Sequence, residues 1–504
     1  MLKCGLIGAS LKHSYSAEIH RRLSDGAYSY RLIEIKEDGI EDFIRSGIDA
    51  FNVTIPYKKT VVKFLDRIDA SASLSGAVNT VVKRRAAEFE SGQGENETQK
   101  DEGKEAESKT SAHGIKSGYA ESEIQKKQEN ENETAPYGIK NEGAENEIQK
   151  KQENETVTAA RGIKSGYENE ILKNKGAENE TVTVGYNTDF FGFKYLLEAN
   201  GIDVRGKDVF ILGDGGTTAT VKAVLNSLGV GSITVVSRRG AVNYENYMNF
   251  SANAAVLINA SPVGMYPDNG ECLVDLARFK NLEAVADVIY NPLKTRLIFS
   301  AEERGIRCCS GLQMLVAQAK FAAELFTGKS IENRVIESIT RDITIEKRNI
   351  VLIGMPGSGK SSIGRTAAAL SGRKFIDTDE EIAGREGASI PYIFEKKGEK
   401  YFREREAFAV REAGKTSGSV ISTGGGVVLN RENYYALKQN AVIIYVKRGL
   451  NLLASAGRPL SAKFSAAELF SARKSLYENF ADYEIENDGK IADAVKKVLD
   501  IGKL

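Results

Sequence analysis

Cysteine is scarce in this chain of 504 residues, which also lacks long apolar runs and any excess charge of one sign. The four cysteines, at positions 4, 272, 308 and 309, have no CxxC spacing. This excludes a disulfide framework or a zinc site of the usual kind and indicates reduced cytosolic thiols. Lysine and arginine together number 69, as do aspartate and glutamate, so no overall field favours nucleic acid or an anionic membrane.

The longest apolar run, residues 441–446, has the length of a strand and falls far short of the roughly 18 residues of a membrane span. The first ten residues, MLKCGLIGAS, contain no secretory signal pattern. We therefore expect a cytoplasmic protein that binds small molecules and has neither a nucleic-acid nor a membrane partner. The sequence leaves its oligomeric state open.

Four blocks follow one another along the chain, at about 1–85, 86–181, 182–341 and 348–504, which fits the two to four domains expected at this length. The first, third and fourth alternate short apolar runs with helical patterns, which predicts an α/β fold. The short charged segment 340–347 is predicted to be a linker.

The second block repeats itself and is rich in Glu, Asn, Lys, Gln and Gly. The tripeptide GIK recurs at Gly114, Gly138 and Gly162, and EIQKKQENE at Glu123 and Glu147, so the period is 24 residues in both cases. Each repeat has too few large apolar residues to form a core, which predicts a solvated, mostly disordered insertion. Repeat expansion without function and a partner-binding segment both remain open.

A phosphate-binding loop, GMPGSGKS, occupies residues 354–361 between a predicted strand (350–353) and a predicted helix (361–370). Backbone N–H groups of such a loop hold the β-phosphate of ATP, the Lys360 side chain reaches the β- and γ-phosphates, and the Ser361 hydroxyl ligates Mg²⁺. The predicted nucleotide contacts are Gly357, Ser358, Gly359, Lys360, Ser361 and Ser362.

A second nucleotide signal follows the apolar strand 207–212, where the sequence GDGGTT begins at Gly213 and leads into a helix. Gly213 permits a tight turn, and Gly215 and Gly216 let the backbone approach a pyrophosphate at the helix N-terminus. Taken alone the signal is weak, because such turns are common between strands and helices.

The next strand, 232–236, ends in Ser237, Arg238 and Arg239 instead of the acidic residue typical of NAD sites. Guanidinium groups can bind the additional phosphate of NADP, so the pattern favours NADP over NAD. The alternative is a solvated strand end.

Several polar clusters precede and follow the insertion. They are Ser14 and Ser16, the segment NVTIPYK at 52–58, SGAVNT ending at Thr80, and GYNTDFFG at 185–192. With INASPVGM (258–265), DVIYNP (287–292) and GLQMLVAQA (311–319), they resemble shikimate dehydrogenase over residues 1–85 and 182–330.

This resemblance implies a substrate domain (1–85 and 182–202), a Rossmann-like NADP domain (203–309) and C-terminal helices that return to the substrate domain (310–340). It implies that Ser14 and Ser16 hold a carboxylate, that Lys58 and Asp189 form the catalytic pair, that Thr54, Asn79 and Gln318 contact ring hydroxyls, and that Tyr290 and Gly311 line the substrate and nicotinamide sites. It also implies that Asn79 and Asp189 lie close together, because the insertion replaces a short hairpin.

The fourth block carries DTD (377–379), GEKYFREREAF (398–408), STGGG (422–426), GRPL (457–460) and RKSLYENFADY (473–483), and in this order it resembles shikimate kinase over 348–504. The resemblance implies that Asp377 supports Mg²⁺, that Asp379 meets the attacking hydroxyl, that Arg403, Gly425 and Arg473 bind the acid, and that Arg458 stabilises the transferring phosphate. Two residues also have a structural alternative: Arg473 is expected on a solvated helix, and Glu406 is expected to be a structural partner of Arg403.

Together these patterns predict a bifunctional enzyme that reduces 3-dehydroshikimate with NADPH and then phosphorylates shikimate with ATP. Two alternatives remain open: a dehydrogenase-like half that only senses a ligand, and quinate as the dehydrogenase substrate.

Overall fold

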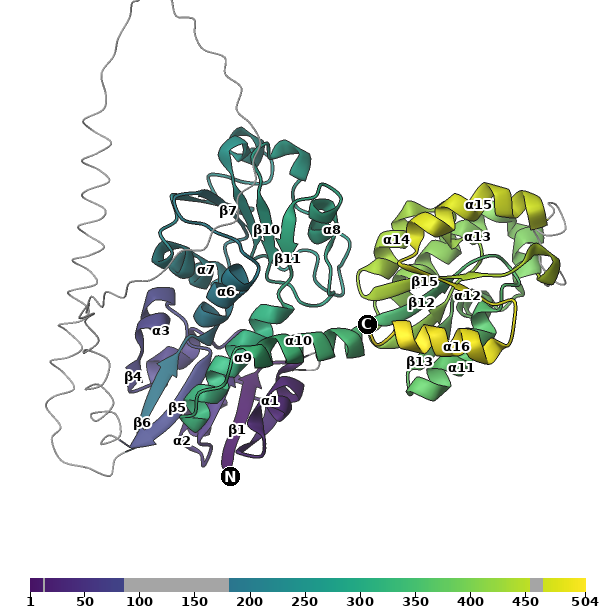
Figure 1. Cartoon of the computed structure of the whole chain (residues 1–504). Helices are drawn as coiled ribbons and strands as arrows, with labels where there is room; N and C mark the ends of the chain where they lie inside the picture. The colour runs from purple at the N-terminus through teal and green to yellow at the C-terminus, as the bar shows by residue number, and fades with distance from the viewer. Residues whose placement is uncertain (12–13, 86–180, 454–465) are drawn as a thin grey trace, which may run out of the picture. The chain divides into compact units, whose positions relative to one another are not determined.

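A computed structural model describes residues 1–11, 14–85, 181–453 and 466–504 (Figure 1). The predictions about the insertion and about Arg458 lie outside these residues. The predicted α/β class is confirmed, since the described residues form one mixed and two parallel sheets.

The first sheet has the strand order β2-β1-β3-β5-β6-β4. Strands β1 and β2 and strands β1 and β3 run parallel, whereas β3 and β5 are antiparallel. The strands are β1 (Leu2–Gly8), β2 (Tyr28–Glu34), β3 (Ala50–Val53), β4 (Arg67–Ile68), β5 (Thr80–Arg85) and β6 (Thr181–Tyr186), with helices α1 (Ser16–Ser24), α2 (Ile40–Arg45) and α3 (Ala70–Ser75).

The second sheet is parallel throughout, in the order β11-β10-β9-β7-β8. Its strands are short and apolar, as expected when helices cover both faces of a parallel sheet. The elements are α6 (Thr188–Ala199), β7 (Asp208–Leu212), α7 (Gly216–Ser227), β8 (Ser232–Val236), β9 (Val256–Asn259), β10 (Ala284–Asp287), α8 (Arg296–Glu302) and β11 (Arg307–Cys309). Helix α7 begins at Gly216, directly on the glycine-rich turn.

Helices α9 (Leu312–Thr327) and α10 (Arg334–Lys347) return to the first sheet, and α6 packs against both α7 and α9. Ile336, Ile339 and Ile343 of α10 are buried in one core with α9, α1 and the first sheet. The prediction of a linker at 340–347 was therefore wrong. Three charged residues of this segment, Asp342, Glu346 and Lys347, form ion pairs with residues of α1, while the apolar positions of the helix recur at helical spacing.

The third sheet is also parallel, in the order β13-β14-β12-β15-β16, and the phosphate-binding loop follows its central strand β12. Its strands are β12 (Asn349–Ile353), β13 (Lys374–Asp377), β14 (Ser419–Ser422), β15 (Ala441–Lys447) and β16 (Tyr483–Glu486). Its helices are α11 (Lys360–Ser371), α12 (Thr378–Glu386), α13 (Ile390–Gly414), α14 (Arg431–Lys438), α15 (Ala466–Phe480) and α16 (Ile491–Ile501).

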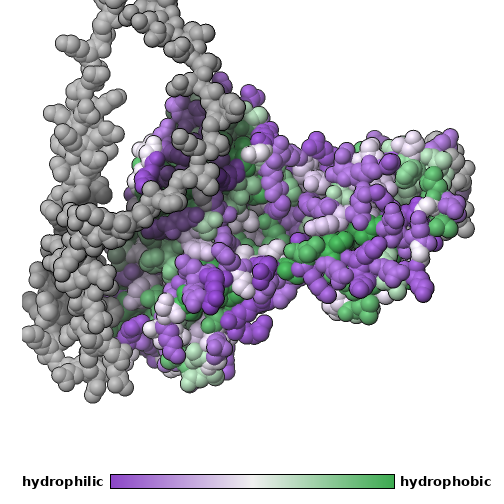
Figure 2. Space-filling view, viewed as in Figure 1, coloured by the Kyte–Doolittle hydropathy of each residue, from purple (hydrophilic) through white to green (hydrophobic). Residues whose placement is uncertain are grey.

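Short 3-10 helices connect these elements: η1 (Glu37–Gly39), η2 (Thr60–Phe64), η3 (Tyr247–Asn249), η4 (Ser251–Asn253), η5 (Leu276–Arg278), η6 (Val427–Leu429) and η7 (Leu450–Leu452). Figure 2 shows hydrophilic residues over much of the visible face of the described residues, with apolar residues in smaller groups. Among the helices of the described segments, each is too short or too polar to cross a bilayer.

Candidate active sites

A cavity of 340 Å³ collects the polar residues predicted for the dehydrogenase reaction. Its volume is in the range of small-molecule sites. Loops after β1 and β3, the start of α6, the loop after β10 and helix α9 all contribute to its wall. The predicted residues in the wall are Ser14, Ser16, Thr54, Lys58, Asn79, Asp189, Tyr290, Gly311 and Gln318.

Lys58 and Asp189 form an ion pair in this cavity, with 2.6 Å between Lys58 Nζ and Asp189 Oδ2. Lys58 follows β3, while Asp189 lies in the first turn of α6, where the helix dipole stabilises a carboxylate. The Lys58 side chain keeps 28% of its surface exposed and that of Asp189 keeps 18%, so the pair remains accessible to a small ligand. A carboxylate that orients an ammonium beside a cavity can support proton donation to a ligand oxygen.

Some cavity residues escaped the sequence reasoning, including Asn52, Thr217 and Met314. Asn52 lies in the motif NVTIPYK and Thr217 in GDGGTT, so the sequence could have predicted both as cavity residues. Met314 faces the cavity from α9, and no local pattern separates it from the other apolar residues of that helix. Burial raises the pKa of the predicted wall residue Tyr290, whose ring centroid is 5.3 Å from that of Tyr15.

The glycine-rich turn fits a dinucleotide phosphate. Gly215 is the N-cap of α7 and provides no side-chain cap, and a Cβ added at Gly215 or Gly216 would have no atom within 4 Å. The space in front of the helix N-terminus is therefore open to a ligand. Gly213 has a φ of +98°, and a Cβ there would lie 3.0 Å from the backbone of Ser261, so this position requires glycine.

Arg238 and Arg239 are exposed just after β8, and within the described part of the chain neither forms an ion pair. Both guanidinium groups thus remain available at the carboxyl end of the strand next to β7. This arrangement fits a cofactor with an additional phosphate on its ribose.

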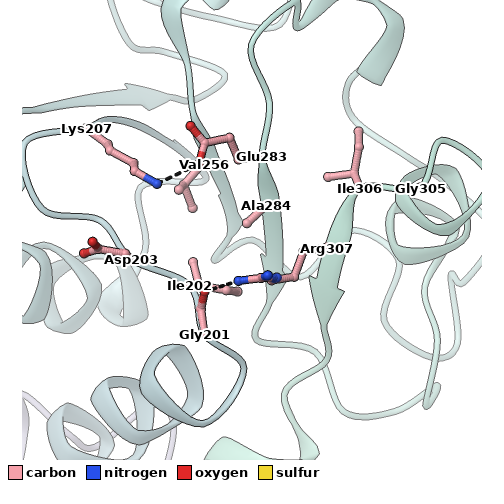
Figure 3. A pocket seen from close by; sticks show the side chains of 10 residues that line it. All are labelled: Gly201, Ile202, Asp203, Lys207, Val256, Glu283, Ala284, Gly305, Ile306 and Arg307. Carbon is pink, nitrogen blue, oxygen red and sulfur yellow. Dashed lines mark hydrogen bonds and ion pairs between the residues drawn. The ribbon is translucent and has the colours of Figure 1, made fainter. Parts of the chain in front are cut away.

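A larger cavity, of 780 Å³, lies at the opposite, amino-terminal edge of the second sheet (Figure 3). Its charged groups already have partners: Lys207 pairs with Glu283 at 2.6 Å, and the Arg307 guanidinium donates to the carbonyl oxygen of Gly201. It contains none of the predicted functional residues, so the candidate dehydrogenase site is the smaller cavity.

In the third sheet, the phosphate-binding loop connects β12 to α11 as predicted. The Lys360 Nζ donates to the carbonyl oxygens of Gly354 and Met355, at 2.9 and 3.0 Å, which holds it across the loop. The Ser361 hydroxyl donates to Asp377 Oδ2 at 2.7 Å. A hydroxyl and a carboxylate at this distance fit Mg²⁺, which takes few protein oxygens and keeps waters and phosphates as its other ligands.

Two carboxylates converge beside Gly424. A Cβ added at Gly424 would lie 2.7 Å from Asp379 Oδ1 and 2.9 Å from Glu406 Oε1, and both oxygens are buried without a hydrogen-bond partner in the described structure. Burial, followed by the negative charges of Asp377 and Glu406, raises the pKa of Asp379 to about 6. A carboxylate with this pKa, facing an open position, can act as a general base near neutral pH.

Two arginines lie around the same position. Arg403 Nη1 donates to Glu406 Oε2 at 2.7 Å, and Arg473 Nη1 donates to the carbonyl oxygen of Gly425 at 3.1 Å. Arg473 is only 5% exposed, so the expectation of a solvated helix face was wrong at this residue. Packing of α15 against η6, in the segment after β14, buries it.

Comparisons with known proteins identify both halves. Residues 356–501 match the family model for shikimate kinase, and residues 6–81 match that for the shikimate dehydrogenase substrate binding domain. The shikimate kinase of Acinetobacter baumannii is 37% identical over 163 residues, covering 30% of this chain and 91% of that protein. The enzyme of Actinobacillus pleuropneumoniae is 40% identical over 159 residues, covering 30% and 92%.

The NADP-dependent shikimate dehydrogenase of Clostridium perfringens is 25% identical over 360 residues, covering 67% of this chain and 97% of that protein. Among solved structures, shikimate dehydrogenase 1 of Peptoclostridium difficile matches with 25% identity and a TM-score of 0.45, covering 68% of this chain and 97% of that one. The chain therefore combines an N-terminal shikimate dehydrogenase-like region with a C-terminal domain that belongs to the shikimate kinase family.

Proposed function

We propose that this chain catalyses two consecutive reactions: NADPH-dependent reduction of 3-dehydroshikimate to shikimate, and ATP-dependent phosphorylation of the 3-hydroxyl that this reduction forms. The observation that carries the proposal is the convergence of nine predicted residues on one cavity around the Lys58–Asp189 ion pair. A site that only binds a ligand would not need such a proton-transfer pair. The product of the first reaction is the acceptor of the second, which gives the fusion a chemical logic.

In the proposed reduction, the hydroxyls of Ser14 and Ser16 bind the substrate carboxylate, while Asn79, Thr54 and Gln318 bind ring hydroxyls. NADPH, when bound at the turn before α7, supplies the hydride to the carbonyl carbon. The Lys58 ammonium stabilises the negative charge that develops on the carbonyl oxygen and transfers its proton there. Asp189 orients Lys58 through their ion pair.

In the proposed phosphorylation, Arg403 and Arg473 bind the carboxylate of shikimate and so aim one hydroxyl at the γ-phosphate. Asp379 accepts the proton of that hydroxyl as its oxygen attacks phosphorus and the bond to ADP breaks. Mg²⁺, held through Ser361 and Asp377, neutralises charge on the phosphates. Lys360 and Arg458 stabilise the charge that develops on the transferring group.

A paired assay tests the proposal. NADPH oxidation with 3-dehydroshikimate and ADP release with shikimate are measured for the wild type, Lys58→Ala and Lys360→Ala. Lys58→Ala should abolish the first activity and largely spare the second, and Lys360→Ala should do the reverse. If the wild type binds shikimate but does not oxidise NADPH in the presence of 3-dehydroshikimate, the dehydrogenase proposal is refuted in favour of a ligand sensor. If the wild type turns over quinate faster than shikimate, the proposed substrate is wrong.

A further inference from the structure

The side-chain amide of Asn79 has only one possible orientation in the proposed dehydrogenase cavity. Its Oδ1 accepts from the backbone N–H of Thr188 at 2.7 Å, and also lies 3.1 Å from the hydroxyls of Thr188 and Thr80. Because a backbone N–H can only donate, the amide oxygen must face Thr188. The Nδ2 of Asn79 has no protein partner among the described residues, and Asn79 lines the cavity. Asn79 therefore presents its N–H groups to a ligand.

Gln318 is oriented in the same sense from the other side of the cavity. Its Nε2 donates to the backbone carbonyl of Leu315 at 2.9 Å, and its Oε1 accepts from the hydroxyl of Thr188 at 3.3 Å. A carbonyl oxygen can only accept, so the assignment of nitrogen and oxygen in this amide is also determined. Thr188 thus contacts both amides, donating from its backbone N–H to Asn79 and from its hydroxyl to Gln318.

Thr188 is itself firmly held and lies outside the cavity wall. It is 0% exposed, and its Oγ1 lies 2.9 Å from the Oγ1 of Thr80, which in turn accepts from Asn52 Nδ2 at 2.9 Å. Because Thr80 can donate the hydrogen bond between the two hydroxyls, the one proton of the Thr188 hydroxyl is left for Oε1 of Gln318, while the backbone N–H of Thr188 serves Asn79. Such a buried and fully connected network fixes side-chain orientation more strongly than isolated hydrogen bonds would.

We infer that Thr188 is a positioning residue, which turns the amide oxygens of Asn79 and Gln318 away from the cavity so that the site presents N–H donors to the ring oxygens of its substrate. The inference rests on the proposed dehydrogenase function and concerns how that site selects hydroxylated rings. A site with oriented, buried donors discriminates strongly against an analogue that lacks the matching hydroxyl, because its donors are then left unpaired.

The test compares kcat/KM for 3-dehydroshikimate with kcat/KM for deoxy analogues that each lack one ring hydroxyl. Thr188→Val removes the hydroxyl and keeps the shape and the backbone N–H, while Thr188→Ser keeps the hydroxyl. Thr220→Val is the matched control: Thr220 is 3% exposed, and its hydroxyl accepts from Asn187 at 3.1 Å. No hydrogen bond in the described structure joins it to either amide.

The expected result is selective. Thr188→Val should lower kcat/KM for the parent substrate about tenfold and change that for one deoxy analogue less than about twofold, so discrimination falls about tenfold. Gln318→Ala should lose discrimination for the same hydroxyl, and adding Thr188→Val to it should cost nothing further. Thr188→Ser and Thr220→Val should keep the wild-type discrimination.

The inference is overturned if Thr188→Val lowers kcat/KM equally for the parent substrate and the analogues, or does not lower it at all. It is also overturned if Thr220→Val causes the same loss of discrimination. None of these results contradicts the proposed reaction. A wild type that does not reduce 3-dehydroshikimate would instead refute the proposed reaction. In that case, calorimetric binding of shikimate and deoxyshikimates to the same variants provides the readout. An unchanged preference in Thr188→Val, or no binding by the wild type, then overturns the inference.

Discussion

Kinase activity should fall about tenfold between pH 7 and pH 5, because Asp379 is the proposed base and its pKa is raised to about 6. Burial is the main cause, and the charges of Asp377 and Glu406 add to it. With a pKa of about 6, roughly nine-tenths of the carboxylates are ionised at pH 7 and about one-tenth at pH 5. An ordinary aspartate would stay more than about nine-tenths ionised at pH 5 and would give an almost flat profile.

The appropriate measurement is kcat/KM for shikimate at saturating ATP and Mg²⁺, because this ratio reports the protonation of the enzyme before shikimate binds. Glu406→Gln removes a negative charge beside Asp379, so the pKa of Asp379 should fall and the acid limb should move to lower pH. The loss between pH 7 and pH 5 then becomes smaller than tenfold.

Glu399→Gln is the matched control for this substitution. Glu399 also binds Arg403, with Oε1 3.1 Å from Nη2, but it is half-exposed and its charge is not among the main influences on Asp379. Both variants weaken the hold on Arg403, which can raise KM at every pH, yet only Glu406→Gln should shift the profile. A flat wild-type profile, or equal shifts in the two variants, would refute the reasoning.

Three further substitutions test the packing that supports the two sites. Gly311→Ala places a Cβ 2.0 Å from the carbonyl oxygen of Val288, so dehydrogenase kcat/KM should fall by at least about 100-fold with kinase activity retained, as measured by the paired assay. Gly426→Ala places a Cβ 2.0 Å from Arg403 Nη1, so the KM for shikimate should rise about tenfold while that for ATP changes little in initial-rate kinetics. Asp287→Ala leaves a hydroxyl, an amide and a backbone N–H buried without their acceptor, and urea unfolding should show a loss of about 3 kcal/mol.

Local sequence was sufficient to predict the two glycine-rich turns between strand and helix. The loop at 354–361 and the turn at 213–218 are each specified by a few adjacent residues, since glycine permits the required backbone and the flanking apolar runs form strand and helix. The boundaries of strand β8 and the α/β class followed from the same short-range patterns.

Contacts between residues far apart in the sequence could be predicted only where the order of the motifs indicated a known family. The sequence resemblance placed Asn79 beside Asp189 although the insertion separates them, and both line one cavity in the structure. Nothing in the local pattern around Thr188 indicated that it contacts both Asn79 and Gln318, because the three residues come from distant segments of the chain.

The sequence by itself determined the α/β class of this protein and predicted the charged residues of the proposed chemistry, because residue type and short spacing encode those properties. Only the tertiary structure decided which of those charges are buried and what they contact. It buried Arg473, placed Asp379 and Glu406 on either side of Gly424, and packed residues 340–347 into a helix of the core. Burial and electrostatic coupling depend on every element packed around a residue, so they cannot be read from its neighbours in the chain.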